Sequence, residues 1–97
     1  MESKQLPRTY KYDVIADALY ARELEYFHYE FDANNFEMIL RKMPEGDERI
    51  NFEKRLADTK AQMEKVDDIY RAIECQIDDK DEYNLAVLRM KAKRENV

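Results

Sequence analysis

Apolar side chains, with one threonine among them, recur at alternating steps of four and three in the second half of the chain. The series is Phe52, Leu56, Thr59, Met63, Val66, Tyr70, Ile73 and Ile77. This spacing places side chains along one stripe of an α-helix and is typical of a coiled-coil seam. The pattern therefore predicts a helix over residues 48–77 with one apolar face.

Residues 13–43 predict a longer helix that carries two apolar flanks. The first flank comprises Ile15, Tyr26, Tyr29, Ala33, Phe36 and Leu40, and the second comprises Tyr20, Leu24, Phe27, Phe31 and Met38. One neighbouring helix covers only one stripe of this width. We interpret the second flank as an interface. A third helix of the same chain, a second copy of the chain or a different protein would cover it.

Local signals place the ends of these helices. Asp13 is a candidate N-cap, and Pro44 disfavours helical geometry at the residue before it. The turn after the first helix contains Gly46, the only glycine of the chain. The acidic run at residues 78–82 interrupts the apolar pattern, and Asp79 and Glu82 have the spacing of a capping box. A third helix over residues 80–94 is expected, and the alternative is one helix that continues through the acidic run.

These elements together predict an all-α fold. The tight turn makes the first two helices antiparallel neighbours, so we expect a long, coiled-coil-like helical hairpin with a short third helix. The domain would span residues 13–97 and follow a flexible basic arm over residues 1–12. Because the second flank of the first helix needs a cover, we expect a dimeric helical bundle.

A stripe of polar residues runs between the two apolar flanks of the first helix. Its members are Glu25, His28, Asp32 and Asn35, at steps of three, four and three. In an antiparallel hairpin Tyr70 would face Glu25, and His28 would pair with Asp32 one turn away. Buried polar groups normally have hydrogen-bond partners, so we interpret these five residues as a buried polar layer that fixes helix register.

The same stripe permits an alternative with a metal ion. Glu25 and His28 match the Glu-x-x-His spacing of ferritin-like di-iron bundles, in which such residues project into a four-helix core. A dimer of hairpins would bring two copies of this pair together. The alternative function is therefore a ferritin-like metal-binding protein.

Composition and charge narrow the function classes. The chain has 97 residues with one glycine, two prolines and 40% charged residues, which favours long helices in one domain. Its net charge is −5, which disfavours binding to nucleic acid, where affinity depends largely on neutralising phosphates. An acidic nucleic-acid mimic stays open as a further alternative. Its carboxylate face would consist of Glu23, Glu30, Glu37, Glu53, Glu64 and Asp68.

Motifs of catalysis, secretion and membrane insertion are not found in the sequence. Cys75 is the only cysteine, so no internal disulfide is possible and a cytoplasmic location is expected. No apolar run suits a membrane helix, no secretory signal is recognisable, and no nucleophile–histidine set or glycine-rich phosphate loop occurs. We expect a non-enzymatic interaction module without a cofactor, acting as an adaptor, regulator or inhibitor through an unidentified protein partner. Its small size and acidity would suit a phage or mobile-element protein.

Overall fold

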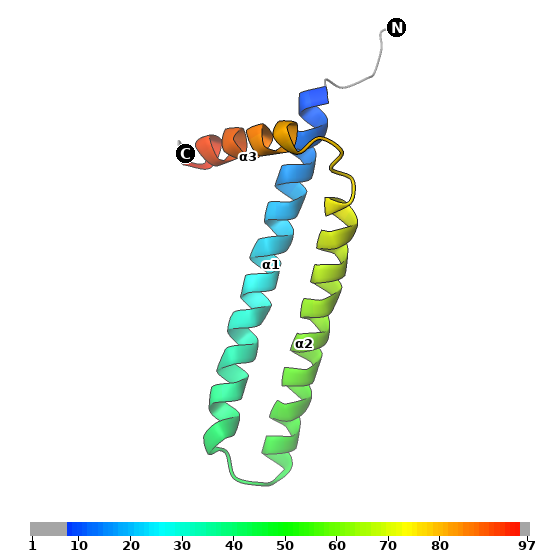
Figure 1. Cartoon of the computed structure of the whole chain (residues 1–97). Coiled ribbons are helices and arrows are strands. Elements are labelled where there is room, and N and C mark those ends of the chain that lie inside the picture. The colour runs from blue at the N-terminus through cyan, green and yellow to red at the C-terminus, as the bar shows by residue number, and fades with distance from the viewer. Residues whose placement is uncertain (1–7, 96–97) are drawn as a thin grey trace, which may run out of the picture. The chain divides into compact units, whose positions relative to one another are not determined.

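The computed structural model describes residues 8–95, and three helices contain most of them (Figure 1). They are α1 (Arg8–Lys42), α2 (Asp47–Glu74) and α3 (Lys80–Glu95), and no strand occurs within the described range. The predicted all-α class is therefore confirmed. The described chain divides into two compact units. The first contains the described residues up to Ala21 and those from Tyr70 on, and the second is Arg22–Ile69.

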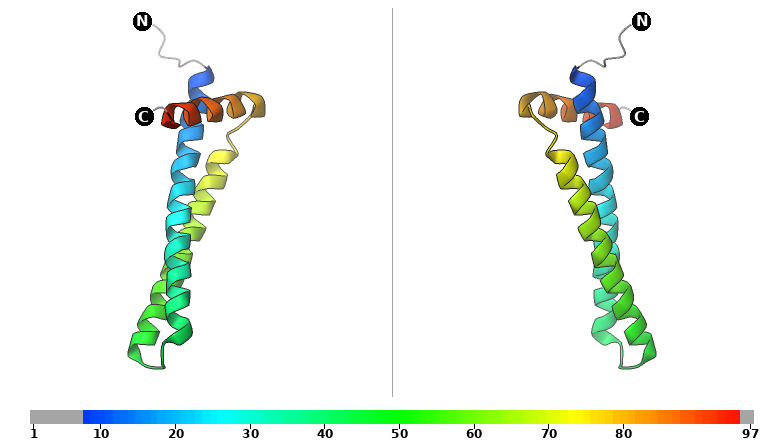
Figure 2. Two further views of the ribbon diagram at one scale, coloured as in Figure 1. Left: turned by 90° about the vertical axis from the view of Figure 1, so that its left-hand side faces the viewer. Right: turned by 90° about the vertical axis from the view of Figure 1, so that its right-hand side faces the viewer.

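The first unit is formed where α3 packs across the N-terminal part of α1 (Figures 1 and 2). Its buried core consists of Tyr12, Ile15, Ala16, Leu19 and Ala86. The four α1 residues among them lie on one face of the helix, at the i, i+3, i+4 and i+7 spacing of an amphipathic stripe. Alanine at both Ala16 and Ala86 allows two helix backbones to approach closely. Six half-buried side chains surround this core: Tyr70, Ile73, Ile77, Tyr83, Val87 and Met90.

The N-terminal boundary of α1 differs from the prediction. Residues 1–7 of the expected flexible arm lie outside the described range, but residues 8–12 are helical and Tyr12 has no exposed surface. The Tyr12 hydroxyl donates a hydrogen bond to Asp78. Asp13 is therefore not an N-cap. It lies inside the helix and accepts a 2.7 Å hydrogen bond from the guanidinium of Arg89. The predicted boundary was wrong because burial against α3 extends the helix past the local capping signal.

The second helix ends at Glu74, three residues before the predicted end at residue 77, and a break separates it from α3 as expected. Residues 75–79 are not helical, and α3 begins at Lys80. The carboxylate of Asp79 accepts a 3.2 Å hydrogen bond from the backbone N–H of Glu82. This bond satisfies one of the free N–H groups at the start of a helix. The separate third helix is confirmed, and Asp79 caps it.

The second unit pairs the C-terminal half of α1 with most of α2. The two segments lie side by side and run in opposite directions from the turn that joins them (Figures 1 and 2). The rings of Phe36 and Phe52 lie 5.9 Å apart, and Lys60 forms a 3.2 Å ion pair with Glu37. The buried side chains of this unit are Ala33, Leu40 and Val66. They belong to the first flank of α1 and to the apolar series of α2.

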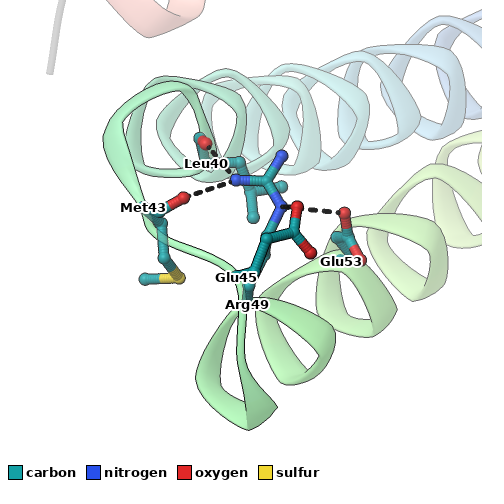
Figure 3. A network of polar contacts seen from close by, with 5 residues as sticks. All are labelled: Leu40, Met43, Glu45, Arg49 and Glu53. Atoms are coloured by element: carbon teal, nitrogen blue, oxygen red, sulfur yellow. Dashed lines mark hydrogen bonds and ion pairs between the residues drawn. The ribbon is translucent and has the colours of Figure 1, made fainter.

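The turn between α1 and α2 depends on one arginine and one glycine. Arg49 donates hydrogen bonds of 2.8 Å and 2.7 Å to the carbonyl oxygens of Leu40 and Met43, as Figure 3 shows. Its guanidinium also lies 3.3 Å from Glu53. Carbonyl groups at a helix C-terminus have no partner within the helix, so Arg49 fills that role for α1. Gly46 has a φ of +150°, a conformation that side-chain-bearing residues rarely adopt.

Removing the Arg49 side chain is expected to weaken this turn. Arg49→Ala deletes two hydrogen bonds from a charged donor, each worth about 1.5–3 kcal/mol when fully formed in protected surroundings. The arginine is partly exposed, so we expect a loss of about 1–2 kcal/mol in total. Thermal unfolding followed by circular dichroism measures it. Arg41→Ala, at an exposed site of the same turn region, is the control and should change the melting temperature little.

Candidate interaction surface

Most of the large apolar side chains that α1 exposes in the second unit lie on one stripe of the helix. Leu24, Phe27, Phe31 and Met38 have exposed fractions of 51%, 58%, 65% and 62%. We call these four residues the α1 surface. They belong to the second flank identified in the sequence, whereas the first flank includes the buried Ala33 and Leu40 and contacts α2 through the rings of Phe36 and Phe52. The chain thus presents an exposed apolar stripe on a helix, which marks a candidate interaction site.

The α1 surface has the spacing of a coiled-coil seam with one polar member. Asn34 is exposed and lies between Phe31 and Met38, so the series at residues 24, 27, 31, 34 and 38 proceeds by steps of three and four. In heptad notation, residues 24, 31 and 38 take position a, and residues 27 and 34 take position d. Asn34 was not among the predicted interface residues, although the alternating steps of three and four along the sequence identify it.

Different polar residues border the two edges of the α1 surface. One edge, the g positions of the heptad, carries Glu23, Glu30 and Glu37, and the other edge, the e positions, carries His28, Asn35 and Lys42. All six belong to the second unit. One edge is uniformly acidic, whereas the other contains no acid. A partner helix would therefore meet two chemically distinct borders.

Tyr20, the fifth predicted interface residue, lies in the first unit and has a partner within the chain. The guanidinium of Arg94 lies 3.4 Å from the centre of its ring, which is a close cation–π contact. Arg94 is also 3.5 Å from the carboxylate of Asp17. One face of the Tyr20 ring is therefore covered by Arg94 of α3. In this respect Tyr20 differs from the four residues of the α1 surface.

The α3 side chains considered as a cover for the second flank pack against the core of their own unit. They are Tyr83, Val87 and Met90. A second copy of the chain and a different protein are the other two covers left open by the sequence.

The predicted polar layer is not buried within the chain. Glu25 and Asn35 are exposed, and the His28 side chain is 75% exposed. Glu25 pairs with Arg22 at 3.0 Å, one turn earlier on α1, and His28 lies 3.8 Å from its expected partner Asp32. The expectation of burial was wrong for the single chain because α2 covers only the first flank and leaves the stripe at the open edge. Tyr70 packs in the first unit, half-buried.

The metal alternative requires more ligands than this stripe supplies. Across residues 8–95, no group of three or more histidine, cysteine, aspartate or glutamate side chains is close enough to hold a metal ion. Within the described part of the chain, Glu25 and His28 therefore have no third ligand beside them.

Substitutions in the stripe test whether it binds metal. Glu25→Gln and His28→Ala are expected to shift the free energy of unfolding by no more than about 0.5 kcal/mol each, because both replace members of exposed ion pairs. Mass spectrometry should find no stoichiometric metal in the purified wild-type protein. About one iron, manganese or zinc per chain, lost in both variants together with a lower melting temperature, would contradict this prediction.

The acidic face proposed for a nucleic-acid mimic is partly neutralised. Glu37 pairs with Lys60, and Glu53 pairs with Arg49. Glu23, Glu30, Glu64 and Asp68 are exposed. Two of the six carboxylates of that face thus already balance cations of the second unit, which reduces the charge that the face offers.

Comparisons with protein-family models, with curated proteins and with solved structures gave no match to this chain. The functional proposal therefore rests on the chain's own residues. None of the helices within residues 8–95 combines the length and the apolar character needed to cross a membrane.

Proposed function

We propose that this protein is a small non-enzymatic interaction module whose α1 surface binds a helix of another polypeptide chain. The observation that supports it is the exposure of Leu24, Phe27, Phe31 and Met38 along one stripe of α1. Aromatic residues and methionine are enriched at the centres of protein interfaces. A stripe at heptad spacing fits a helix better than it fits an extended peptide or a small molecule. The finer proposal includes the long coiled-coil-like hairpin as the scaffold that displays this stripe.

A stable complex requires a partner with an apolar face of its own, because burial of this stripe alone does not offset the free-energy cost of association. Full burial of one such side chain stabilises a complex by about 1.5–3 kcal/mol, and somewhat more than half of each remains to be buried here. The four together contribute on the order of 4–6 kcal/mol, whereas association costs about 4–15 kcal/mol. One chain's stripe thus only balances the lower part of that cost. A matching stripe on the partner supplies the rest.

A role as adaptor, regulator or inhibitor follows from this mode of binding. A rigid helix that presents an apolar stripe can occupy a site otherwise taken by another helix, or can hold two proteins together. Cys75 is a free, exposed thiol, and such thiols persist in reducing compartments. We therefore propose a cytoplasmic location.

Site-directed photo-crosslinking tests the proposal. A photoreactive phenylalanine analogue at Phe31 should yield a covalent adduct when the purified protein is irradiated alone or in lysate of its native host. The same analogue at Ile50, an equally exposed apolar position on α2, is the matched control and should yield little adduct. Adducts with a second copy or with a defined host protein support the proposal. No adduct at Phe31 beyond that at Ile50 would overturn it.

A further inference from the structure

We infer that the occupant of the α1 surface is a second copy of this chain, with the two α1 helices parallel and in register. This inference rests on the proposed function and names the partner of the same surface. It depends on three properties of the second unit: the free stripe, its polar member Asn34 and the unequal edges. Each constrains the orientation of the partner.

The first property is that nothing in the second unit obstructs a second α1. The first flank of α1 faces α2, while Leu24, Phe27, Phe31 and Met38 are more than half exposed. Packing two copies stripe to stripe buries eight large apolar side chains. The back of α2 offers no comparable stripe, because its exposed residues are mostly charged or polar. The α1 surface is therefore the face on which a second copy matches apolar area with apolar area.

The second property is the position of Asn34 in the seam. In a parallel, in-register pair, each d residue meets the d residue of the other chain, so Asn34 meets the partner's Asn34 and the two amides can hydrogen-bond. In an antiparallel pair d residues meet a residues. Asn34 would then face Leu24, Phe31 or Met38 of the other copy and lose its hydrogen bonds. A single polar seam residue of this kind sets register and orientation in coiled coils.

The third property is the charge of the two edges. In a parallel pair the g residues of one helix face the e residues of the other, which brings Glu23, Glu30 and Glu37 opposite His28, Asn35 and Lys42 respectively. Every such contact joins a carboxylate to a hydrogen-bond donor or a cation. Glu37 keeps its 3.2 Å ion pair with Lys60 on one side. Lys42 of the other copy would approach from the other side.

An antiparallel pair inverts this complementarity. Its g residues face g residues, and every g position over this stretch is a glutamate. With the two stripes aligned over their full length, Glu23 and Glu37 would meet each other and Glu30 would meet its own copy, and like charges in such contacts destabilise a pair. The edges thus disfavour the same orientation that Asn34 disfavours.

Sedimentation of the full chain tests whether the copies associate through this surface. Wild-type protein at micromolar concentration is expected to sediment at twice the 11.8 kDa chain mass. Phe31→Ser should raise the dissociation constant roughly 100-fold or more, because each dimer loses two buried rings. Phe31 is mostly exposed in the single chain, so this variant should keep its helicity. Ile50→Ser, at a position of similar exposure on α2, is the matched control and should leave the dissociation constant within about threefold.

Cysteine trapping tests the orientation. In a Cys75→Ser background, Arg41→Cys lies at the C-terminal end of the stripe and Leu24→Cys at its N-terminal end. The two positions are about 25 Å apart along one helix, and a disulfide needs Cα atoms within roughly 4.4–6.8 Å. Parallel packing is expected to give a 41–41 disulfide in glutathione buffer. Gln62→Cys, on the exposed side of α2, should give none.

The outcomes separate this inference from the proposed function. A dimer that Phe31→Ser disrupts and that forms the 41–41 disulfide supports the parallel pair. Mixed Arg41→Cys and Leu24→Cys chains that instead join to each other would show antiparallel packing and overturn the inference. A monomer at all concentrations, or a dimer unaffected by Phe31→Ser, would also overturn it. In these cases photo-crosslinking from Phe31 to a host protein would still support the proposed function. The absence of any adduct would contradict both the proposed function and the parallel pair.

Discussion

Replacing Leu19 by alanine is expected to lower the free energy of unfolding by about 2–5 kcal/mol. Leu19 is 1% exposed, and with Tyr12 it is one of two large side chains among the described residues that are fully buried. Its removal leaves a cavity in a core of five buried residues. The cost within this range depends on how far the half-buried side chains around the core move into that space. A domain of this size has about 5–15 kcal/mol of total stability, so the effect is large.

Denaturant unfolding followed by helical circular dichroism measures this loss. Leu88→Ala is the matched control, because Leu88 is also a leucine in a helix of the first unit but is mostly exposed. It should change the free energy of unfolding by no more than about 0.5 kcal/mol. Equal effects of the two substitutions would show that α3 does not pack on the face of α1 that contains Leu19.

Val66→Asp is expected to destabilise the second unit by on the order of 3 kcal/mol or more. Val66 is 6% exposed and is the buried residue of α2. An aspartate there would place an unpaired carboxylate among apolar side chains, so it must either stay charged at a high desolvation cost or bind a proton. Either outcome weakens the packing of α2 on α1.

Two controls separate burial from the introduction of charge. Ile69→Asp adds the same side chain at an exposed position of α2, and Glu64→Ala changes an exposed neighbour. Both should shift the melting temperature only slightly. All proteins are compared at one concentration, because association raises apparent stability by mass action. If Ile69→Asp were as damaging as Val66→Asp, the apolar series of α2 would not be the buried face.

The sequence determined the elements and their ends wherever the signal was local. The alternating steps of α2 identified Val66 as a seam residue, and the structure buries it. The break expected at residues 78–82 and the cap at Asp79 need only a few neighbouring residues; the cap is present, and the break lies at residues 75–79. The two flanks of α1 are also a property of helical spacing alone. Periodicity could therefore predict that α1 has more apolar surface than one neighbour can cover.

Only the tertiary structure decided which faces are buried and which polar groups have partners. Tyr12 bonds to Asp78 and Arg89 to Asp13, across sequence separations of 66 and 76 residues. With those contacts α1 begins at Arg8. Asp13, the expected N-cap, is instead the ion-pair partner of Arg89. Glu25 and His28 of the polar stripe are exposed because α2 covers only the first flank of α1. The burial of a helix face depends on which distant segment of the chain packs against it. The spacing of residues within one helix carries no information about that packing.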